Sequence, residues 1–107
     1  MAQFFTQNVT VAKDKIQAKE ELVEVPAKGN VTLFNQGNHP SLKVTLSNQS
    51  IKNACEVYTV EGWFSKKNWV SPSLFPKKSL TFKVAKNGSV FIENYSEETF
   101  TILVKVH

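Results

Sequence analysis

The sequence contains no arginine and only one aspartate, so lysine and glutamate set its charge. Thirteen lysines stand against eight glutamates and Asp14, which gives a net charge of +4. Lysine neutralises phosphates, but base reading and two-point phosphate contacts favour the planar guanidinium of arginine. We therefore do not expect a nucleic-acid partner.

Cysteine and histidine are equally scarce. Cys55 is the only cysteine, which excludes a disulfide within the chain, and we expect it to act as a small buried hydrophobe. The two histidines are His39, in a turn before Pro40, and His107, the last residue. A turn and a chain end are poor platforms for a catalytic triad, and the spacing fits no zinc site. We predict no enzyme activity, no metal and no cofactor.

Long hydrophobic runs are also missing. No stretch approaches the roughly 20 apolar residues of a membrane span. The first fifteen residues hold no basic segment followed by an apolar one, as a secretory leader would. We therefore expect a soluble chain that is cytoplasmic or released without a classical signal, and the sequence leaves its compartment open.

What the sequence does contain is alternation of apolar and polar residues. It is clearest at residues 42–46, 80–84 and 100–106, and such a period of two is typical of a strand with one face on a core. Shorter runs predict further strands at 5–11, 22–25, 31–33, 55–60 and 90–92. The one helix candidate is the segment 11–24, which is rich in lysine and glutamate, and we expect it to be a charged loop or a single helical turn.

These short strands and their spacing predict the fold class. About eight strands separated by turn residues indicate a single all-β domain over residues 1–107. We predict an antiparallel two-sheet sandwich that resembles a jelly roll. Asn87-Gly88 lies between two alternating runs and predicts a tight hairpin. With the strand that follows, this hairpin predicts a three-stranded antiparallel meander from Ser79 to Val106.

Five asparagines begin an Asn-x-Ser/Thr triplet, which is the acceptor pattern for N-glycosylation. Asparagine is also favoured in turns, and serine and threonine on strand faces. We interpret the five as turn and strand residues, with glycosylation as the alternative. They are Asn8, Asn30, Asn48, Asn87 and Asn94.

Aromatic and cationic side chains gather in residues 62–78, which hold both tryptophans. Aromatic faces beside cations suit sugar stacking, an anionic glycan or a membrane interface. The alternative is that the tryptophans anchor the core and the first lysine pair lies at a solvated hairpin tip. The candidate binding residues are Trp63, Phe64, Lys66, Lys67, Trp69, Phe75, Lys77 and Lys78.

The N-terminal segment is a second candidate surface. It is extended and partly apolar, and a charged segment follows it. An unpaired strand of this kind adds to the sheet edge of a neighbouring subunit, or pairs within its own sheet. The candidate assembly residues are Phe4, Phe5, Val9 and Val11.

The pattern KSLTFKVAKNGSVFIEN at residues 78–94, with FTILVKV at 100–106, resembles the end of bacterial jelly rolls. It is similar in layout to the small subunit of PirAB-type binary toxins and to subunits of endospore appendage fibres. The first resemblance implies glycan or receptor binding. The second implies a fibre subunit with an N-terminal cysteine-bearing connector, a cysteine that is not found here.

Two functions are therefore expected. The leading hypothesis is a non-enzymatic structural subunit that self-assembles into a fibre, lattice or oligomer through sheet edges and its N-terminal strand. The alternative is a β-sandwich module that binds a carbohydrate or a cell surface and serves as a small toxin component. Self-association is the expected partnership of the first, and a glycan or membrane surface that of the second.

Overall fold

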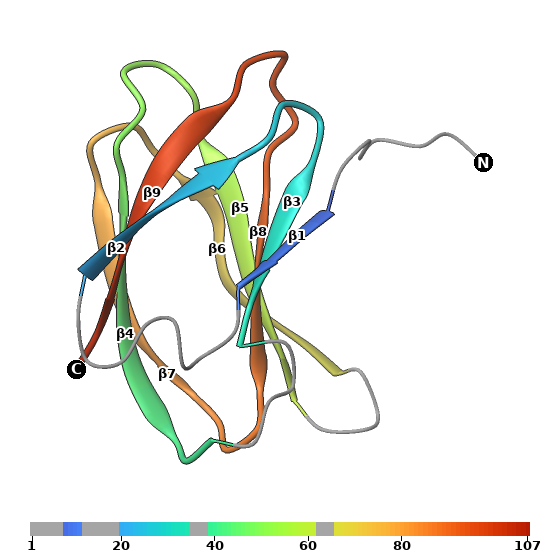
Figure 1. The fold of residues 1–107 in the computed structure, drawn as a ribbon, viewed down its shortest axis with the longest axis vertical. Helices are drawn as coiled ribbons and strands as arrows, with labels where there is room; N and C mark the ends of the chain where they lie inside the picture. The colour runs from blue at the N-terminus through green and yellow to red at the C-terminus, as the bar shows by residue number, and fades with distance from the viewer. Residues whose placement is uncertain (1–7, 12–19, 35–38, 62–65) are drawn as a thin grey trace.

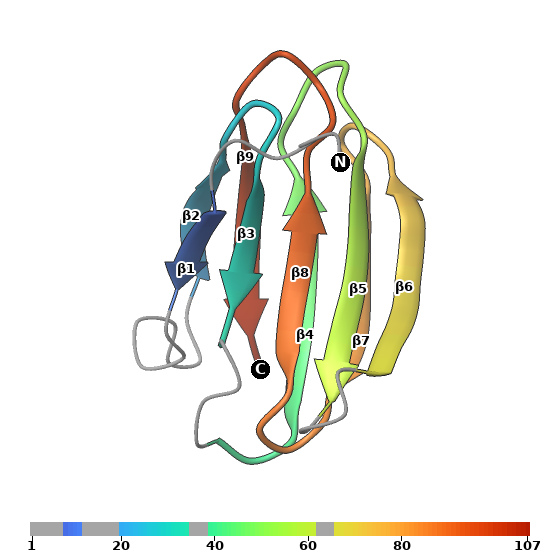
Figure 2. The same cartoon turned by 90° about the vertical axis from the view of Figure 1, so that its right-hand side faces the viewer.

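The computed structural model describes residues 8–11, 20–34, 39–61 and 66–107, and its elements there are all β-strands. In chain order the strands are β1 (Asn8–Val11), β2 (Glu20–Val25), β3 (Asn30–Leu33), β4 (Leu42–Asn48), β5 (Cys55–Glu61), β6 (Lys66–Leu74), β7 (Ser79–Val84), β8 (Ser89–Glu93) and β9 (Phe100–Val106). They form two sheets packed face to face (Figures 1 and 2). Sheet A has the order β1-β3-β8-β5-β6, and sheet B has the order β2-β9-β4-β7.

Strands β2 to β9 have the connectivity of a jelly roll. Each strand of the first half pairs antiparallel with its counterpart counted back from the C-terminus: β2 with β9, β3 with β8, β4 with β7 and β5 with β6. The chain is thus one long hairpin, folded at the β5–β6 connection and wound into two sheets. The predicted fold class, an all-β two-sheet sandwich with a jelly-roll layout, is confirmed.

The core lies between the sheets and follows from the alternation. In β4 and β9 every second residue is buried, and Val44 and Ile102 have no exposed surface. Val57 and Ile92 of sheet A face them from the other side. Burying one such side chain contributes about 1.5–3 kcal/mol. Cys55 is also buried in this core, as predicted.

The predicted meander is wrong. Strand β7 pairs with β4 in sheet B, and β8 pairs with β3 and β5 in sheet A, so Asn87-Gly88 turns the chain from one sheet into the other. Strand β9 then returns to sheet B. Asn87 does adopt the left-handed backbone expected of a turn asparagine, with a φ of 61°. The turn was therefore predicted correctly, but the sheet that its second strand joins was not.

Strand β1 is the one exception to antiparallel pairing among the described strands. It pairs in parallel with β3 of its own chain at the edge of sheet A. Val9 and Val11 of the predicted assembly segment lie in this strand, whereas Phe4 and Phe5 lie outside the described residues. Of the segment 11–24, predicted to be a charged loop or helical turn, residues 12–19 also lie outside them, and the prediction is wrong for residues 20–24, which pair with β9 as part of β2. No helix in the described ranges has the length and apolarity needed to cross a membrane.

Candidate functional site

Four loops meet at one end of the sandwich, uppermost in Figures 1 and 2. They connect β2 to β3, β4 to β5, β6 to β7 and β8 to β9. In a wound hairpin every second connection falls at the same end, which is why loops far apart in sequence gather there. Their residues are 26–29, 49–54, 75–78 and 94–99, and we call this region the loop end.

Backbone hydrogen bonds fix these loops to one another and to the ends of the neighbouring strands. The N–H of Lys28 donates to the carbonyl of Ser96 at 3.0 Å, which joins the first loop to the last. The N–H of Gln49 donates to Thr101 at 3.0 Å, and the N–H of Lys77 donates to Asn48 at 2.9 Å. The loop end is therefore a defined surface, and loops held on a rigid scaffold are where proteins commonly carry binding residues.

Apolar side chains are exposed at this end. Of the four large hydrophobic residues that are exposed among those described, three lie in these loops: Ile51 at 85%, Phe75 at 60% and Tyr95 at 45%. The fourth, Leu22, lies on β2. Single exposed hydrophobic residues are ordinary, but three of them in loops that meet at one end make this end the candidate binding surface.

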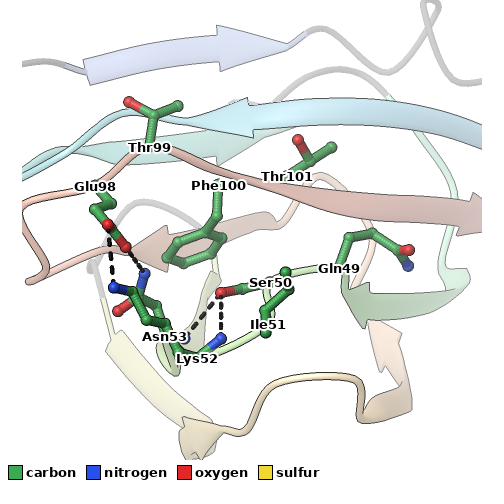
Figure 3. A pocket seen from close by; sticks show the side chains of 9 residues that line it. All are labelled: Gln49, Ser50, Ile51, Lys52, Asn53, Glu98, Thr99, Phe100 and Thr101. Carbon is green, nitrogen blue, oxygen red and sulfur yellow. Dashed lines mark hydrogen bonds and ion pairs between the residues drawn. The ribbon is translucent and has the colours of Figure 1, made fainter.

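A pocket of about 810 Å³ opens between the β4–β5 loop and the start of β9 (Figure 3). Phe100 lies between the two walls, and Ile51 projects from one of them. The remaining lining is polar and consists of amide, hydroxyl and charged side chains. The lining residues are Gln49, Ser50, Ile51, Lys52, Asn53, Glu98, Thr99, Phe100 and Thr101.

Glu98 is the acidic group of this pocket, and two neighbouring side chains hold its carboxylate. Asn53 Nδ2 donates to its Oε1 at 2.9 Å, and Lys52 Nζ lies 3.3 Å from its Oε2. The hydrogen bond from Asn53 and the charge of Lys52 lower the pKa of Glu98 below its ordinary value. The carboxylate is therefore ionised near neutral pH and is positioned to accept further hydrogen bonds from a ligand.

A second polar cluster lies on the outer face of sheet A, directly below the β8–β9 loop. Glu56 and Glu93 are paired across β5 and β8. Tyr58 donates its hydroxyl to Glu93 Oε1 at 3.0 Å. The Tyr95 hydroxyl lies 3.0 Å from Glu56 Oε1 and 3.2 Å from Glu93 Oε2. Because a phenol has one hydrogen to donate, it cannot satisfy both carboxylates at once.

The surroundings of this cluster perturb the ionisation of Glu93. Burial, and then the hydrogen bond between Glu93 and Glu56, raise the pKa of Glu93 above its ordinary value. Burial and the nearby glutamates also raise the pKa of Tyr58 and Tyr95. Among the described residues, no lysine forms an ion pair with either glutamate. Two carboxyl groups therefore lie side by side here, in surroundings that favour the neutral form of Glu93 more than water does.

At the opposite end of the molecule, His39 connects two chain segments through its hydrogen bonds. Its side chain is buried, with Nδ1 2.6 Å from the carbonyl oxygen of Pro40 and Nε2 2.8 Å from that of Gly88. Its backbone N–H donates to Asn87 Oδ1 at 2.9 Å. The sequence placed His39 in an unanchored turn, but these contacts tie the β3–β4 connection to the β7–β8 turn. Both ring nitrogens are used for structure.

The predicted aromatic and cationic surface is divided by the structure. Lys66 and Lys67 begin β6, whereas Lys77 and Lys78 follow its end, so the two pairs lie about 25–30 Å apart along the strand. Trp69 lies within β6, in register with Tyr58, while Trp63 and Phe64 lie outside the described residues. Phe75, Lys77 and Lys78 are exposed at the loop end, where Lys77 Nζ donates to the carbonyl of Gln49 at 3.3 Å.

The sequence interpretation overlooked Ile51, Asn53 and Glu56. None belongs to a motif, and each becomes notable only because the jelly-roll winding brings distant segments together. Glu98 also belongs to no motif, and it lies exposed in the β8–β9 loop. In the described residues no three acidic, histidine or cysteine side chains form a metal-binding group.

Comparison with known proteins supports the fold alone. No family model and no curated protein matches the sequence. The pre-peptidase C-terminal domain of a Bacillus anthracis collagenase matches with a TM-score of 0.53 and 7% identity, over 94% of this chain and 95% of that one. The Yersinia pseudotuberculosis-derived mitogen matches with a TM-score of 0.52 and 12% identity, over 81% of each chain.

A CENP-C domain from Drosophila melanogaster also matches, with a TM-score of 0.51 and 10% identity over 85% of this chain. This chain spans 59% of the length of that structure. The three differ in what their names describe, and identities of this size indicate a common architecture without a common activity. Function has to be argued from the loop end itself.

Proposed function

We propose that this protein is a non-enzymatic binding module that holds a carbohydrate in the pocket at its loop end. One observation carries the proposal: amide, hydroxyl and carboxylate groups surround an apolar floor in an open pocket of about 810 Å³. That volume lies within the range of about 300–1,000 Å³ typical of small-ligand sites.

The chemistry of the lining matches that of a sugar. A pyranose presents hydroxyl groups around its rim and C–H bonds on its faces, so it needs planar hydrogen-bonding groups beside an apolar surface. Asn53 and Glu98 supply the first, and Ile51 and Phe100 supply the second. Phe75, which is exposed in the β6–β7 loop, offers a further aromatic side chain at the same end.

Binding to an array of mono- and oligosaccharides tests this proposal, followed by titration calorimetry with the best ligand. We expect Gln49→Ala and Asn53→Ala to weaken binding about tenfold each, the equivalent of one hydrogen bond. Lys86→Ala, an exposed lysine in the turn at the opposite end, is the control and should bind normally. A wild-type protein that binds no glycan on the array contradicts the proposal.

The same titration separates the pocket from the tryptophan-containing stretch at residues 62–78. Trp63→Ala and Trp69→Ala should leave the affinity unchanged if the pocket is the site. If these variants lose binding while Asn53→Ala keeps it, the ligand binds along β6 and the assignment to the loop end is wrong.

Self-assembly through β1 is a second candidate, and one observation favours it. This four-residue strand pairs with β3 at the sheet edge, and eight residues, 12–19, separate it from β2. Short edge strands of this kind exchange between copies of a chain by adding to the neighbour's sheet. Light scattering on a variant without residues 1–12 provides the test. Self-assembly through β1 predicts smaller particles, and an unchanged size rules it out.

A further inference from the structure

Three polar residues form a row across the outer face of sheet A. Asn30 on β3 is in register with Glu93 on β8, and Glu93 is in register with Glu56 on β5. Their chain neighbours Val31, Ile92 and Val57 point into the core, so by alternation the three polar side chains share the opposite face. The row lies beside Tyr95 of the β8–β9 loop, which contacts both carboxyl groups.

The hydrogen bonding of this row is incomplete. Asn30 is only 9% exposed, and its buried side-chain oxygen accepts no hydrogen bond. Buried polar atoms without a partner are rare, and each one requires an explanation such as an ion or a water molecule. Next to it, Glu93 is 7% exposed and lies within hydrogen-bonding distance of a second carboxyl group. Among the described residues, this row therefore combines a buried oxygen that has no hydrogen-bond partner with two adjacent carboxyl groups.

We propose that Asn30, Glu93 and Glu56 form a binding site for a calcium ion, with the Tyr95 hydroxyl at its rim. All four groups offer oxygen and none offers nitrogen or sulfur, which favours a hard cation over zinc or copper. Neighbouring strands lie about 4.8 Å apart, and calcium bonds to oxygen at about 2.3–2.6 Å, so an ion beside Glu93 is within reach of side chains from the strands on both sides.

The ligand set also predicts which cation binds and how strongly. Magnesium requires near-octahedral geometry, whereas calcium accepts irregular sets of carboxylate, amide and hydroxyl oxygens. Only two of the ligands here are charged, and water has to complete the shell beside the half-exposed Tyr95. We therefore expect a dissociation constant of about 0.1–1 mM, the range of extracellular calcium modules.

Calcium bound here would act on the loop end without being part of the carbohydrate pocket. It would join β3, β8 and β5 and hold Tyr95, whose loop also carries Glu98 of the pocket. The site does not depend on the proposed function, because its ligands are distinct from the pocket lining. It would be a structural ion that fixes the β8–β9 loop.

Terbium luminescence tests this site directly, because tyrosines such as Tyr58 and Tyr95 sensitise a lanthanide bound close to them. We expect terbium emission on addition to the full chain, displacement by calcium in the 0.1–1 mM range and little displacement by magnesium. Glu56→Gln and Asn30→Ala should each weaken calcium binding at least tenfold. Glu24→Gln removes an exposed carboxylate on β2 and should have no effect.

Thermal melting with calcium or with EDTA provides a second measurement. Calcium at 10 mM should raise the melting temperature of the wild type and of Glu24→Gln but not of Glu56→Gln. Circular dichroism shows whether each variant folds. Glu93 is buried, and Glu93→Gln could fail to fold, so the test of the calcium site uses Glu56→Gln, in which the replaced side chain is only half-buried. No calcium effect on either measurement, or an equal effect in Glu56→Gln and the wild type, overturns the proposal.

Discussion

At the scale of single residues, the asparagines of the Asn-x-Ser/Thr triplets show what sequence can and cannot predict. Their interpretation as turn and strand residues is confirmed for Asn48 and Asn94, which have exposures of 1% and 0% and bond to the backbone of distant loops. A buried asparagine cannot carry a glycan in the folded protein. The sequence could not show which carbonyl groups they bind, because those lie up to 69 residues away.

Replacing Asn94 should cost more stability than any surface substitution. Its amide group donates to the carbonyls of Val25, Pro26 and Glu98 at 3.2, 3.0 and 2.8 Å, and its oxygen accepts from the backbone of Ser96 at 2.9 Å. Asn94→Ala leaves these buried groups without partners, so we expect a loss of about 2–4 kcal/mol in the free energy of unfolding.

Asn94→Asp keeps the size of the side chain but places carboxylate oxygens against three carbonyls, and it should lose at least as much stability. Urea denaturation measures both variants. Gln49→Ala removes an exposed amide with one weak bond of 3.4 Å and should change stability by less than about 0.5 kcal/mol. If Asn94→Ala behaves like this control, its hydrogen bonds do not hold the loop end together.

At the scale of elements, alternation predicted where strands lie but not which sheet they join. The runs at 80–84, 90–92 and 100–106 are all strands, yet they fall in alternate sheets. Alternation fixes which face of a strand is buried, and a turn sequence fixes where the chain reverses. Neither specifies whether the reversal stays in the plane of one sheet or crosses the core, because that choice is made by packing.

Asn87 contributes to the stability of its turn in two ways that substitutions can separate, through its backbone conformation and through its side-chain hydrogen bond. Its backbone is left-handed, and its side chain accepts a hydrogen bond from the N–H of His39 at 2.9 Å. Asn87→Gly loses only the hydrogen bond, while Asn87→Ala also strains the backbone. We expect losses of about 1 kcal/mol for Asn87→Gly and about 2 kcal/mol for Asn87→Ala in urea denaturation. If the two variants lose the same free energy of unfolding, the left-handed backbone of Asn87 places no requirement on the residue at this position.

At the scale of the whole molecule, the candidate sites arise from the winding. The pocket at the loop end joins residues 49–53 to residues 98–101, and the row on sheet A joins Asn30 to Glu93 and Glu56. Such sites combine segments that carry no motif of their own, so composition and spacing could not predict them. Phe75 and the lysines that follow it could be selected as candidate binding residues from the sequence, because they form a local cluster there.

The whole fold should lose stability as the solution becomes alkaline, because several groups are buried in their neutral form. Burial raises the pKa of Cys55 from 9.0 to about 12, and burial beside Glu93 raises that of Tyr58. Between pH 9 and 12 the unfolded chain therefore releases protons that the folded chain retains, so the free energy of unfolding falls as pH rises. At pH 10.5 the contribution of Cys55 alone is about 2 kcal/mol.

Urea denaturation at pH 8 and pH 10.5 measures this loss, and Cys55→Ala identifies its main source. The variant should be less stable than the wild type at pH 8, because it leaves a small cavity in the core. Its further loss on going to pH 10.5 should be about 2 kcal/mol smaller than that of the wild type, since the alanine has no proton to release. The tyrosines remain in both proteins and produce the loss that persists. If the two proteins lose the same free energy, the thiol is not held neutral by the core, and the buried position of Cys55 between the sheets is wrong.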